Sequence, residues 1–168
     1  VKNDGKWMGH NTDASGFAAA LREFLGVDKL RRRRVAIVGA GGAAHAIAYA
    51  IKKLGGRACI FNRTIANAKA LADKYGFEYA VLSPDALLEF EVYSDIIIQT
   101  TSVGAGSDGN PDPKNDPIYF YNFRGTEYVY DIIYNPEVTP MMNRAIAAGC
   151  RVANGKSMLK YQGYRQFK

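Results

Sequence analysis

The sequence has few of the features that would place it outside the ordinary globular classes. Its two cysteines, Cys59 and Cys150, are too few for a disulfide framework, and their spacing matches no zinc-binding pattern. No apolar run approaches the length of a membrane span, and no charged-then-apolar leader marks export. Hydrophobic residues make up 48% and charged residues 23% of the 168 residues, which excludes a disordered chain. We therefore expect a globular, cytoplasmic protein with neither a membrane partner nor a metal site.

The excess of basic residues allows two kinds of partner. Lys and Arg number 22 against 16 acidic residues, a formal net charge of +6, which suits nucleic-acid domains and also proteins that handle phosphorylated ligands. The cluster Arg31 to Arg34 is typical of a solvated turn that enters a strand. Because no aromatic side chains flank a basic stripe on which bases could stack, we do not expect a nucleic-acid partner.

Apolar, β-branched runs alternate with helical periodicity along the chain. After a predicted hairpin over 1–12, we expect strands at 34–38, 58–61, 78–81, 96–99, 128–133 and 151–153, and helices at 13–25, 42–54, 67–75, 86–90, 139–148 and 158–167. Residues 100–117 are rich in Gly, Pro, Asn and Asp and are predicted to form a long loop. This alternation predicts an α/β, Rossmann-like three-layer fold: a mostly parallel twisted sheet with helices on both faces. The loops that follow the strands should share one rim, where ligands bind.

A glycine-rich turn follows the first predicted strand of this sheet. In Gly39-x-Gly41-x-x-Ala44, the first glycine allows a tight turn, the second admits a pyrophosphate, and the alanine leaves room for helix–strand packing. The helix dipole would stand behind the amides that face the anion. A tight strand–helix turn without a ligand is the alternative. The predicted dinucleotide-binding residues here are Gly39, Ala40, Gly41, Gly42 and Ala43.

The end of the second strand indicates which dinucleotide is bound. An NAD site usually has an acidic residue there for the ribose 2′-hydroxyl. That position, 23 residues after Gly39, is Asn62, and Arg63 and Thr64 follow it. A guanidinium attracts and pairs with a phosphate, so the sequence favours NADP, unless Arg63 is merely a surface arginine.

Several motifs, in order, resemble one known family. They are Asn11-Thr12-Asp13; the glycine turn; Asn62-Arg63-Thr64 with Ala68, Leu71 and Ala72; Thr101-Ser102-x-Gly104; Asp131-x-x-Tyr134-x-Pro136-x-x-Thr139-Pro140; and Gly155-x-x-Met158-Leu159-x-x-Gln162. Together they are similar to the nucleotide-binding domain of shikimate dehydrogenase over essentially the whole chain. The resemblance implies an NADP-dependent enzyme that interconverts 3-dehydroshikimate and shikimate on the route to aromatic amino acids.

The resemblance also implies roles for single residues. Asp13 would pair with a lysine at the reacting hydroxyl or ketone, although an N-cap of the following helix is the alternative. Tyr134 and Gln162 would contact the substrate, against the alternatives of a partly buried loop tyrosine and an exposed helix glutamine. Met158 is predicted to be core. The implied substrate-binding residues are Asn11, Asp13, Tyr134 and Gln162; further cofactor-binding residues are Thr101, Ser102, Ile132 and Gly155.

The sequence departs from the family pattern in several places. A basic residue usual three positions after Thr64 is Asn67, and a methionine usual after the Thr-Ser-x-Gly motif is Ala105. In the family, by this resemblance, a substrate domain supplies the catalytic lysine, and we expect that domain to be absent from this chain. We therefore expect residues 1–168 to form the NADP-binding domain, with 1–12 and 155–168 as hinge and substrate rim, and expect negligible turnover from this chain alone.

Some alternatives remain open. An upstream dehydratase domain would make the protein bifunctional. Dual quinate and shikimate specificity, or a non-catalytic NADP-sensing role, would share most of the motifs.

Overall fold

The computed structural model describes residues 2–3, 6–7 and 12–166. Its centre is a six-stranded sheet in the order β5-β4-β3-β6-β7-β8, in which every neighbouring pair is parallel. Numbered from β3 as the first strand, this order is 3-2-1-4-5-6, that of dinucleotide-binding α/β folds. The order reverses between β3 and β6, which makes that point the expected ligand crevice. The strands are β3 (Arg34–Val38), β4 (Arg57–Asn62), β5 (Glu78–Val81), β6 (Ile96–Gln99), β7 (Tyr128–Asp131) and β8 (Arg151–Ala153).

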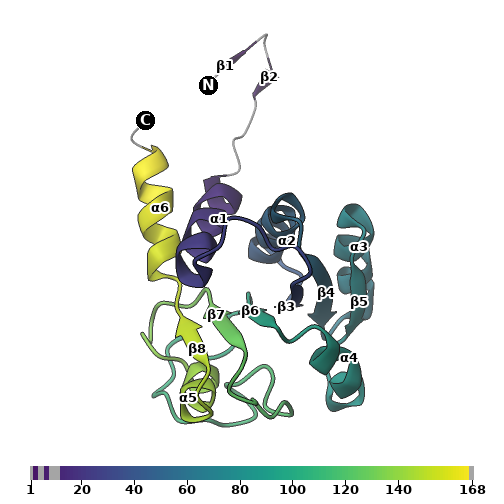
Figure 1. Cartoon of the computed structure of the whole chain (residues 1–168). Helices are drawn as coiled ribbons and strands as arrows, with labels where there is room; N and C mark the ends of the chain where they lie inside the picture. The colour runs from purple at the N-terminus through teal and green to yellow at the C-terminus, as the bar shows by residue number, and fades with distance from the viewer. Residues whose placement is uncertain (1, 4–5, 8–11, 167–168) are drawn as a thin grey trace.

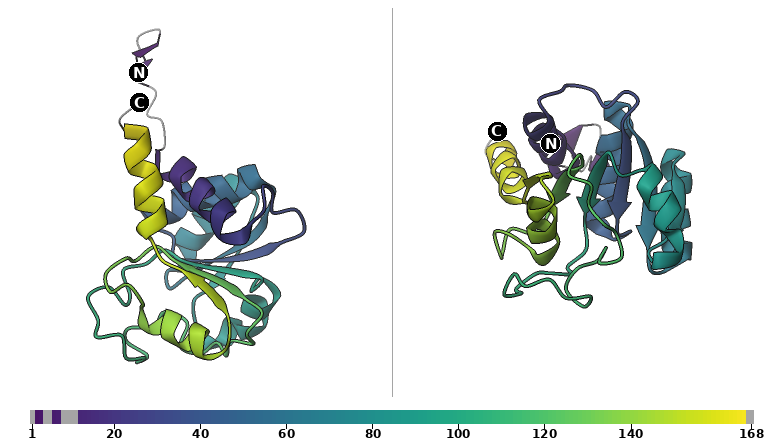
Figure 2. Two further views of the ribbon diagram at one scale, coloured as in Figure 1. Left: turned by 60° about the vertical axis from the view of Figure 1, so that its left-hand side comes forward. Right: turned by 60° about the horizontal axis from the view of Figure 1, so that its bottom comes forward.

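Helices cover both faces of the sheet, so the predicted three-layer α/β fold is confirmed (Figures 1 and 2). One face packs against α1 (Thr12–Leu25), α2 (Gly42–Leu54) and α3 (Ile65–Tyr75). The other packs against a 3-10 turn (Pro84–Ala86), α4 (Leu87–Val92) and α5 (Pro140–Ala147). The last helix, α6 (Lys156–Gln166), leaves β8 and packs along α1. None of the helices in the described part of the chain has the length and apolar character needed to cross a membrane.

Burial on both faces explains why the strands are apolar along their whole length. In β3, Val35 and Ile37 belong to the core beneath α1, α2 and α3. Ala36 and Val38 alternate with them and belong to the core on the side of α4 and α5. The same alternation continues in β4 and β6.

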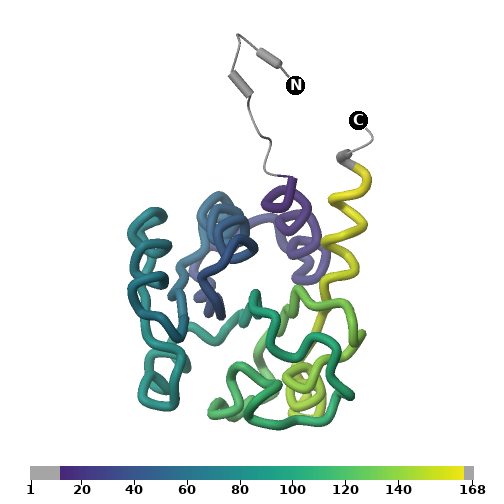
Figure 3. The backbone as a smooth tube through the Cα atoms, turned by 180° about the vertical axis from the view of Figure 1, so that it is seen from behind, coloured from purple at the N-terminus to yellow at the C-terminus, as the bar shows by residue number. Residues whose placement is uncertain are grey.

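The connection between β6 and β7 contains no helix or strand over residues 100–127, and it is longer than the predicted loop (Figure 3). Arg144 of α5 holds it in place. Its Nε lies 2.6 Å from Asp116 Oδ2, and its terminal nitrogens donate to the carbonyl oxygens of Ile118 and Tyr121, each at 2.9 Å. Side-chain hydrogen bonds therefore replace the helix that would usually cover this part of the sheet.

Most boundaries lie within two residues of their predicted positions. The hairpin strands β1 (Lys2–Asn3) and β2 (Lys6–Trp7) pair antiparallel, as expected, and the turn between them lies outside the described residues. The strand predicted over 128–133 is shorter, because the Asp131 side chain accepts a hydrogen bond from the Ile133 amide at 3.0 Å and turns the chain.

Candidate active site

Gly39 lies where three strands converge. It follows β3 with φ 110° and donates its N–H to the Phe61 carbonyl at the end of β4, at 2.8 Å. A Cβ on Gly39 would overlap Thr100 Oγ1 and lie 2.9 Å from Thr101 Cγ2, after β6. Only glycine satisfies both the left-handed backbone and the close approach. The turn therefore sits at the point where the strand order reverses.

The helix that follows this turn begins without a side-chain cap. Gly41 is the N-cap of α2 and has an extended backbone, with no side-chain hydrogen bond to the helix. Gly41 and Gly42 are exposed, and apart from the adjacent residues and the nearby backbone of the helix, no described atom lies within 4 Å of a Cβ built on either one. The first amides of a helix have no intrahelical acceptor. This end of α2, with Ala40 and Ala43 half-buried beside it, therefore fits a pyrophosphate.

The end of β4 offers polar and cationic groups to a ligand. The Asn62 side chain donates to the Thr64 carbonyl at 3.0 Å and so folds over its own loop. Arg63 and Thr64 are exposed, and the Thr64 side chain makes no capping hydrogen bond to α3. Lys69, two positions beyond Asn67, pairs its ammonium with Asp73 at 2.5 Å. The cationic group at this strand end is Arg63.

Gln99 organises the loop after β6, and sequence reasoning missed it. Its buried side chain accepts from the Thr101 amide and donates to the carbonyls of Thr101 and Val103, both at 3.1 Å. The Thr101 hydroxyl accepts from the Val103 amide at 3.1 Å, and Ser102 is exposed. The available signal was an amide side chain at the end of an otherwise apolar strand. Thr101 and Ser102, which are predicted to bind the cofactor, belong to a turn whose shape is fixed by these hydrogen bonds.

Asp131, at the end of β7, is a second residue to which the motifs gave no role. Its buried carboxylate accepts from the Ile133 amide at 3.0 Å and from the Thr139 hydroxyl at 2.8 Å. Thr139 in turn caps α5 by accepting from the Met142 amide at 3.3 Å. Burial raises the pKa of Asp131 to about 7, against the opposing effect of the two hydrogen bonds. The network fixes the loop that carries Ile132.

Gly155 joins the start of α6 to the same loop. A Cβ at this position would overlap the Ile132 carbonyl oxygen, and the Gly155 amide donates to the Ile133 carbonyl at 3.2 Å. The Ile132 amide donates to the Gln99 carbonyl at 3.1 Å. The predicted cofactor residues after β7 and β8 therefore form one backbone surface beside the loop after β6.

Two of the predicted substrate residues meet across α1 and α6. The Gln162 side chain donates to Asp13 Oδ1 at 3.0 Å. The alternative interpretation of Asp13 as N-cap is wrong, because α1 already begins at Thr12 and Asp13 lies within its first turn. Gln162 is half-buried rather than an exposed helix residue, and Met158 is core, as predicted. Asn11 lies outside the described residues.

Tyr134 is the third described residue with a predicted role in binding the substrate. It lies on the loop after β7 and is 52% exposed. The alternative of a partly buried loop tyrosine is therefore wrong. No three described His, Cys, Asp or Glu side chains are grouped so that they could hold a metal ion.

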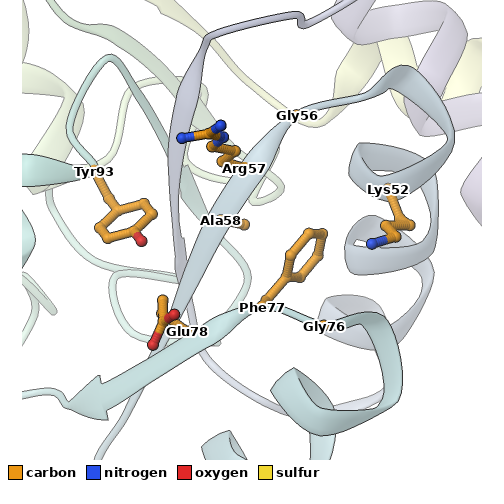
Figure 4. Close-up of a pocket in the computed structure, with 8 residues that line it drawn as sticks. All are labelled: Lys52, Gly56, Arg57, Ala58, Gly76, Phe77, Glu78 and Tyr93. Atoms are coloured by element: carbon orange, nitrogen blue, oxygen red, sulfur yellow. The ribbon is translucent and has the colours of Figure 1, made fainter.

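A pocket of about 330 Å³ lies at the opposite edge of the sheet, at the amino ends of β4 and β5 (Figure 4). Lys52 and Phe77 are on one side of it, with the Lys52 ammonium 5.7 Å from the centre of the ring. It contains none of the predicted site residues. It is lined by Lys52, Gly56, Arg57, Ala58, Gly76, Phe77, Glu78 and Tyr93.

Known proteins resemble the chain over nearly its whole length. It is 39% identical over 166 residues to a shikimate dehydrogenase (NADP(+)) of Desulfitobacterium hafniense, which covers 97% of this chain and 58% of the relative. The shikimate 5-dehydrogenase of Listeria monocytogenes, solved with shikimate and NAD, aligns with a TM-score of 0.82 and 29% identity, over 99% of this chain and 60% of that one. The Thermus thermophilus enzyme, solved with NADP(H) and shikimate, aligns with a TM-score of 0.78 and 30% identity, over 99% and 59%.

The chain thus spans less than two thirds of these relatives. The profile of the family described as "Shikimate / quinate 5-dehydrogenase" matches residues 20–105, just over half of the chain. The matched segment contains the glycine turn, the end of β4 and the start of the loop after β6. This chain belongs to the shikimate / quinate 5-dehydrogenase family.

Proposed function

We propose that this chain is the NADP-binding domain of an enzyme that interconverts 3-dehydroshikimate and shikimate. The observation that carries the proposal is the uncapped start of α2 at the reversal of strand order, with Arg63 at the adjacent strand end. Relatives named shikimate dehydrogenase (NADP(+)), and a neighbour solved with NADP(H) and shikimate, support it. In this proposal residues 1–168 form the cofactor domain, with 1–12 and 155–168 as hinge and substrate rim.

Different described residues would bind different parts of the cofactor. The amides of Gly41 to Ala43 would bind the pyrophosphate, because they begin a helix with no other cap. Arg63 and Thr64 would bind the 2′-phosphate that distinguishes NADP from NAD. The backbone of Ile132 and Gly155 would provide a flat wall for the nicotinamide. The bound cofactor supplies the hydride acceptor or donor.

The substrate would lie between this rim and a second domain of the whole protein. By resemblance, that domain supplies a lysine that exchanges the proton of the reacting oxygen, and Asp13 orients this lysine. Gln162 and Tyr134 would hold the ring. Positioning by both walls provides much of the rate of such a reaction, so the 168-residue chain by itself should bind NADP(H) with negligible turnover.

The cofactor half of the proposal is tested by calorimetric titration of the chain with NADPH and NADH. We expect NADPH to bind more tightly, and Arg63→Ala to lower its affinity on the order of tenfold, since a hydrogen bond to a charged group contributes about 1.5–3 kcal/mol. NADH affinity should hardly change. Absence of NADPH binding would overturn the proposal.

Kinetics of the whole protein test the substrate. Turnover of shikimate with NADP+ is expected, and a higher kcat/KM for quinate would favour the other acid named in the family description. A protein that binds NADPH but converts neither acid would be a sensor. The paired Asp13 and Gln162 favour the enzyme, because a sensor has no use for them.

We also place the protein in the cytoplasm. Cys59 and Cys150 are both buried thiols without a disulfide, which suits a reducing compartment. Burial raises the pKa of Cys59 to about 12 and that of Cys150 to about 11, so neither is a reactive thiolate at neutral pH.

A further inference from the structure

Helices α1 and α6 are in close contact at Gly16. A Cβ built on this buried glycine would lie 2.9 Å from the Gln162 Cγ, 3.3 Å from the Gln162 amide nitrogen and 3.4 Å from the Met158 carbonyl oxygen. The backbone of α6 therefore rests against the space that a side chain would fill. Even an alanine at position 16 would have to displace the Gln162 side chain.

Gly16 lies one turn after Asp13, on the same face of α1. The side chain that a Cβ at position 16 would push away is the one that donates to Asp13 Oδ1 at 3.0 Å. Accepting through Oδ1 fixes the rotation of the Asp13 carboxylate and therefore the direction of Oδ2. The glycine and the hydrogen bond are thus linked through a single side chain.

Helix propensity does not explain this glycine. Glycine inside a helix costs about 1 kcal/mol relative to alanine, so tertiary packing must outweigh that cost. Helix α6 has little freedom to move away, because it is tied at two further places. The Tyr161 hydroxyl donates to Glu23 of α1 at 3.0 Å, and the hydroxyls of Ser157 and Tyr130 lie 3.1 Å apart.

We infer that Gly16 is a positioning residue: by admitting Gln162 against α1, it sets the amide that orients the Asp13 carboxylate. The kinetic consequence rests on the proposed function, in which Asp13 serves the reacting group. The link between Gly16, Gln162 and Asp13 rests on the described contacts alone. The two parts can therefore be tested separately.

The first test is kinetic, in the full-length protein with shikimate and NADP+. Gly16→Ala should lower kcat on the order of tenfold and leave the KM for NADP+ unchanged. Arg22→Ala is the control, since Arg22 is exposed on α1 and lies outside the residues assigned to the cofactor or the substrate, and it should keep full activity. A Gly16→Ala variant with unchanged kcat, or an equal loss in Arg22→Ala, would overturn the inference.

A double variant separates positioning from general damage. In Gln162→Ala the contacting Cγ is absent, so adding Gly16→Ala should cause no further loss of kcat, whereas independent effects would multiply. The substitutions Gly16→Ala and Gln162→Ala also test the contact if the Gly16 variant fails to fold. If Gly16→Ala alone does not fold, Gln162→Ala should restore folding, and a double variant that stays unfolded would contradict the contact.

The second test needs no activity. In the full-length protein without ligands, the side-chain amide resonance of Gln162 should shift in Gly16→Ala toward its position in Asp13→Ala, and should not move in Arg22→Ala. An unmoved resonance in Gly16→Ala refutes the positioning role, whatever the substrate. If the resonance shifts but the wild-type protein does not oxidise shikimate, only the proposed function fails.

Discussion

Replacing Asp131 by asparagine should remove a pH dependence of stability that one buried carboxyl creates. Asp131 is fully buried at the end of β7, and among the described residues no cation forms an ion pair with it. Burial, with a smaller contribution from Asp116, raises its pKa to about 7, although the hydrogen bonds from Ile133 and Thr139 act in the opposite direction. An ordinary aspartate has a pKa near 3.8.

The sign of the effect follows from where the proton is held. Between pH 3.8 and about 7, the folded protein keeps a proton on Asp131 that the unfolded chain has lost. The stabilisation is therefore complete below pH 3.8, declines as the pH rises, and is lost above about 7. From pH 5 to pH 8 the loss is about 3 kcal/mol, at about 1.4 kcal/mol for each pH unit up to 7.

Glu127 does not obscure this pH range. It is buried too, which raises its pKa, but hydrogen bonds led by the Tyr121 hydroxyl outweigh burial and lower the pKa to about 2. Its stabilisation is complete above its ordinary pKa of 4.5 and is lost only as the pH falls toward 2. Glu127 therefore does not contribute to the change in stability above pH 5.

The assay is urea denaturation of the wild-type chain and Asp131→Asn at pH 5 and pH 8. Asparagine can still accept from the Ile133 amide and donate to the Thr139 hydroxyl, so the fold should persist. The wild type should lose about 3 kcal/mol more than the variant between the two pH values. The exposed Asp28→Asn serves as control and should behave like the wild type. If Asp131→Asn shows the same pH dependence as the wild type, the carboxyl is ionised in the folded protein and the reasoning fails.

Two further substitutions test the packing away from the site. Arg144→Ala should lower the free energy of unfolding by about 3 kcal/mol, because it leaves the buried Asp116 carboxylate without its partner and frees the 100–127 connection; urea denaturation measures the loss, and Arg151→Ala, exposed and outside any described ion pair, should have little effect. Arg32→Gly should raise stability by up to about 1 kcal/mol, because Arg32 has φ 67°, a left-handed conformation that glycine adopts freely; an unchanged or lower melting temperature would contradict this.

The features that sequence could predict are those that depend on neighbours along the chain. The β-branched runs gave the strands because both faces of a parallel sheet are apolar. The turn Gly39–Ala44 identified the start of α2 because its glycine spacing is a local requirement. The absence of an acidic residue at position 62 was likewise readable without coordinates.

Other residues have roles that depend on distant partners. Arg144 was an ordinary helix residue in the sequence, yet its guanidinium meets Asp116, 28 positions away. The hydrogen bond between Gln162 and Asp13 joins residues 149 positions apart. No periodicity or local motif encodes such pairs, and the family resemblance indicated that both residues matter without indicating that they touch.

Gly39 and Gly16 show the same difference between features that depend on neighbours along the chain and features that depend on distant partners. Gly39 was predicted to allow the turn and does so, but Thr100 and Thr101 of another strand also leave no room for a side chain there. From the sequence alone, Gly16 would be expected to destabilise its helix, because glycine has a low helix propensity. The reason for it lies on α6, in the Gln162 side chain that a Cβ would displace. A glycine that is unfavourable for its own helix therefore indicates a contact with another part of the fold. Here that contact is with Gln162, which donates a hydrogen bond to Asp13.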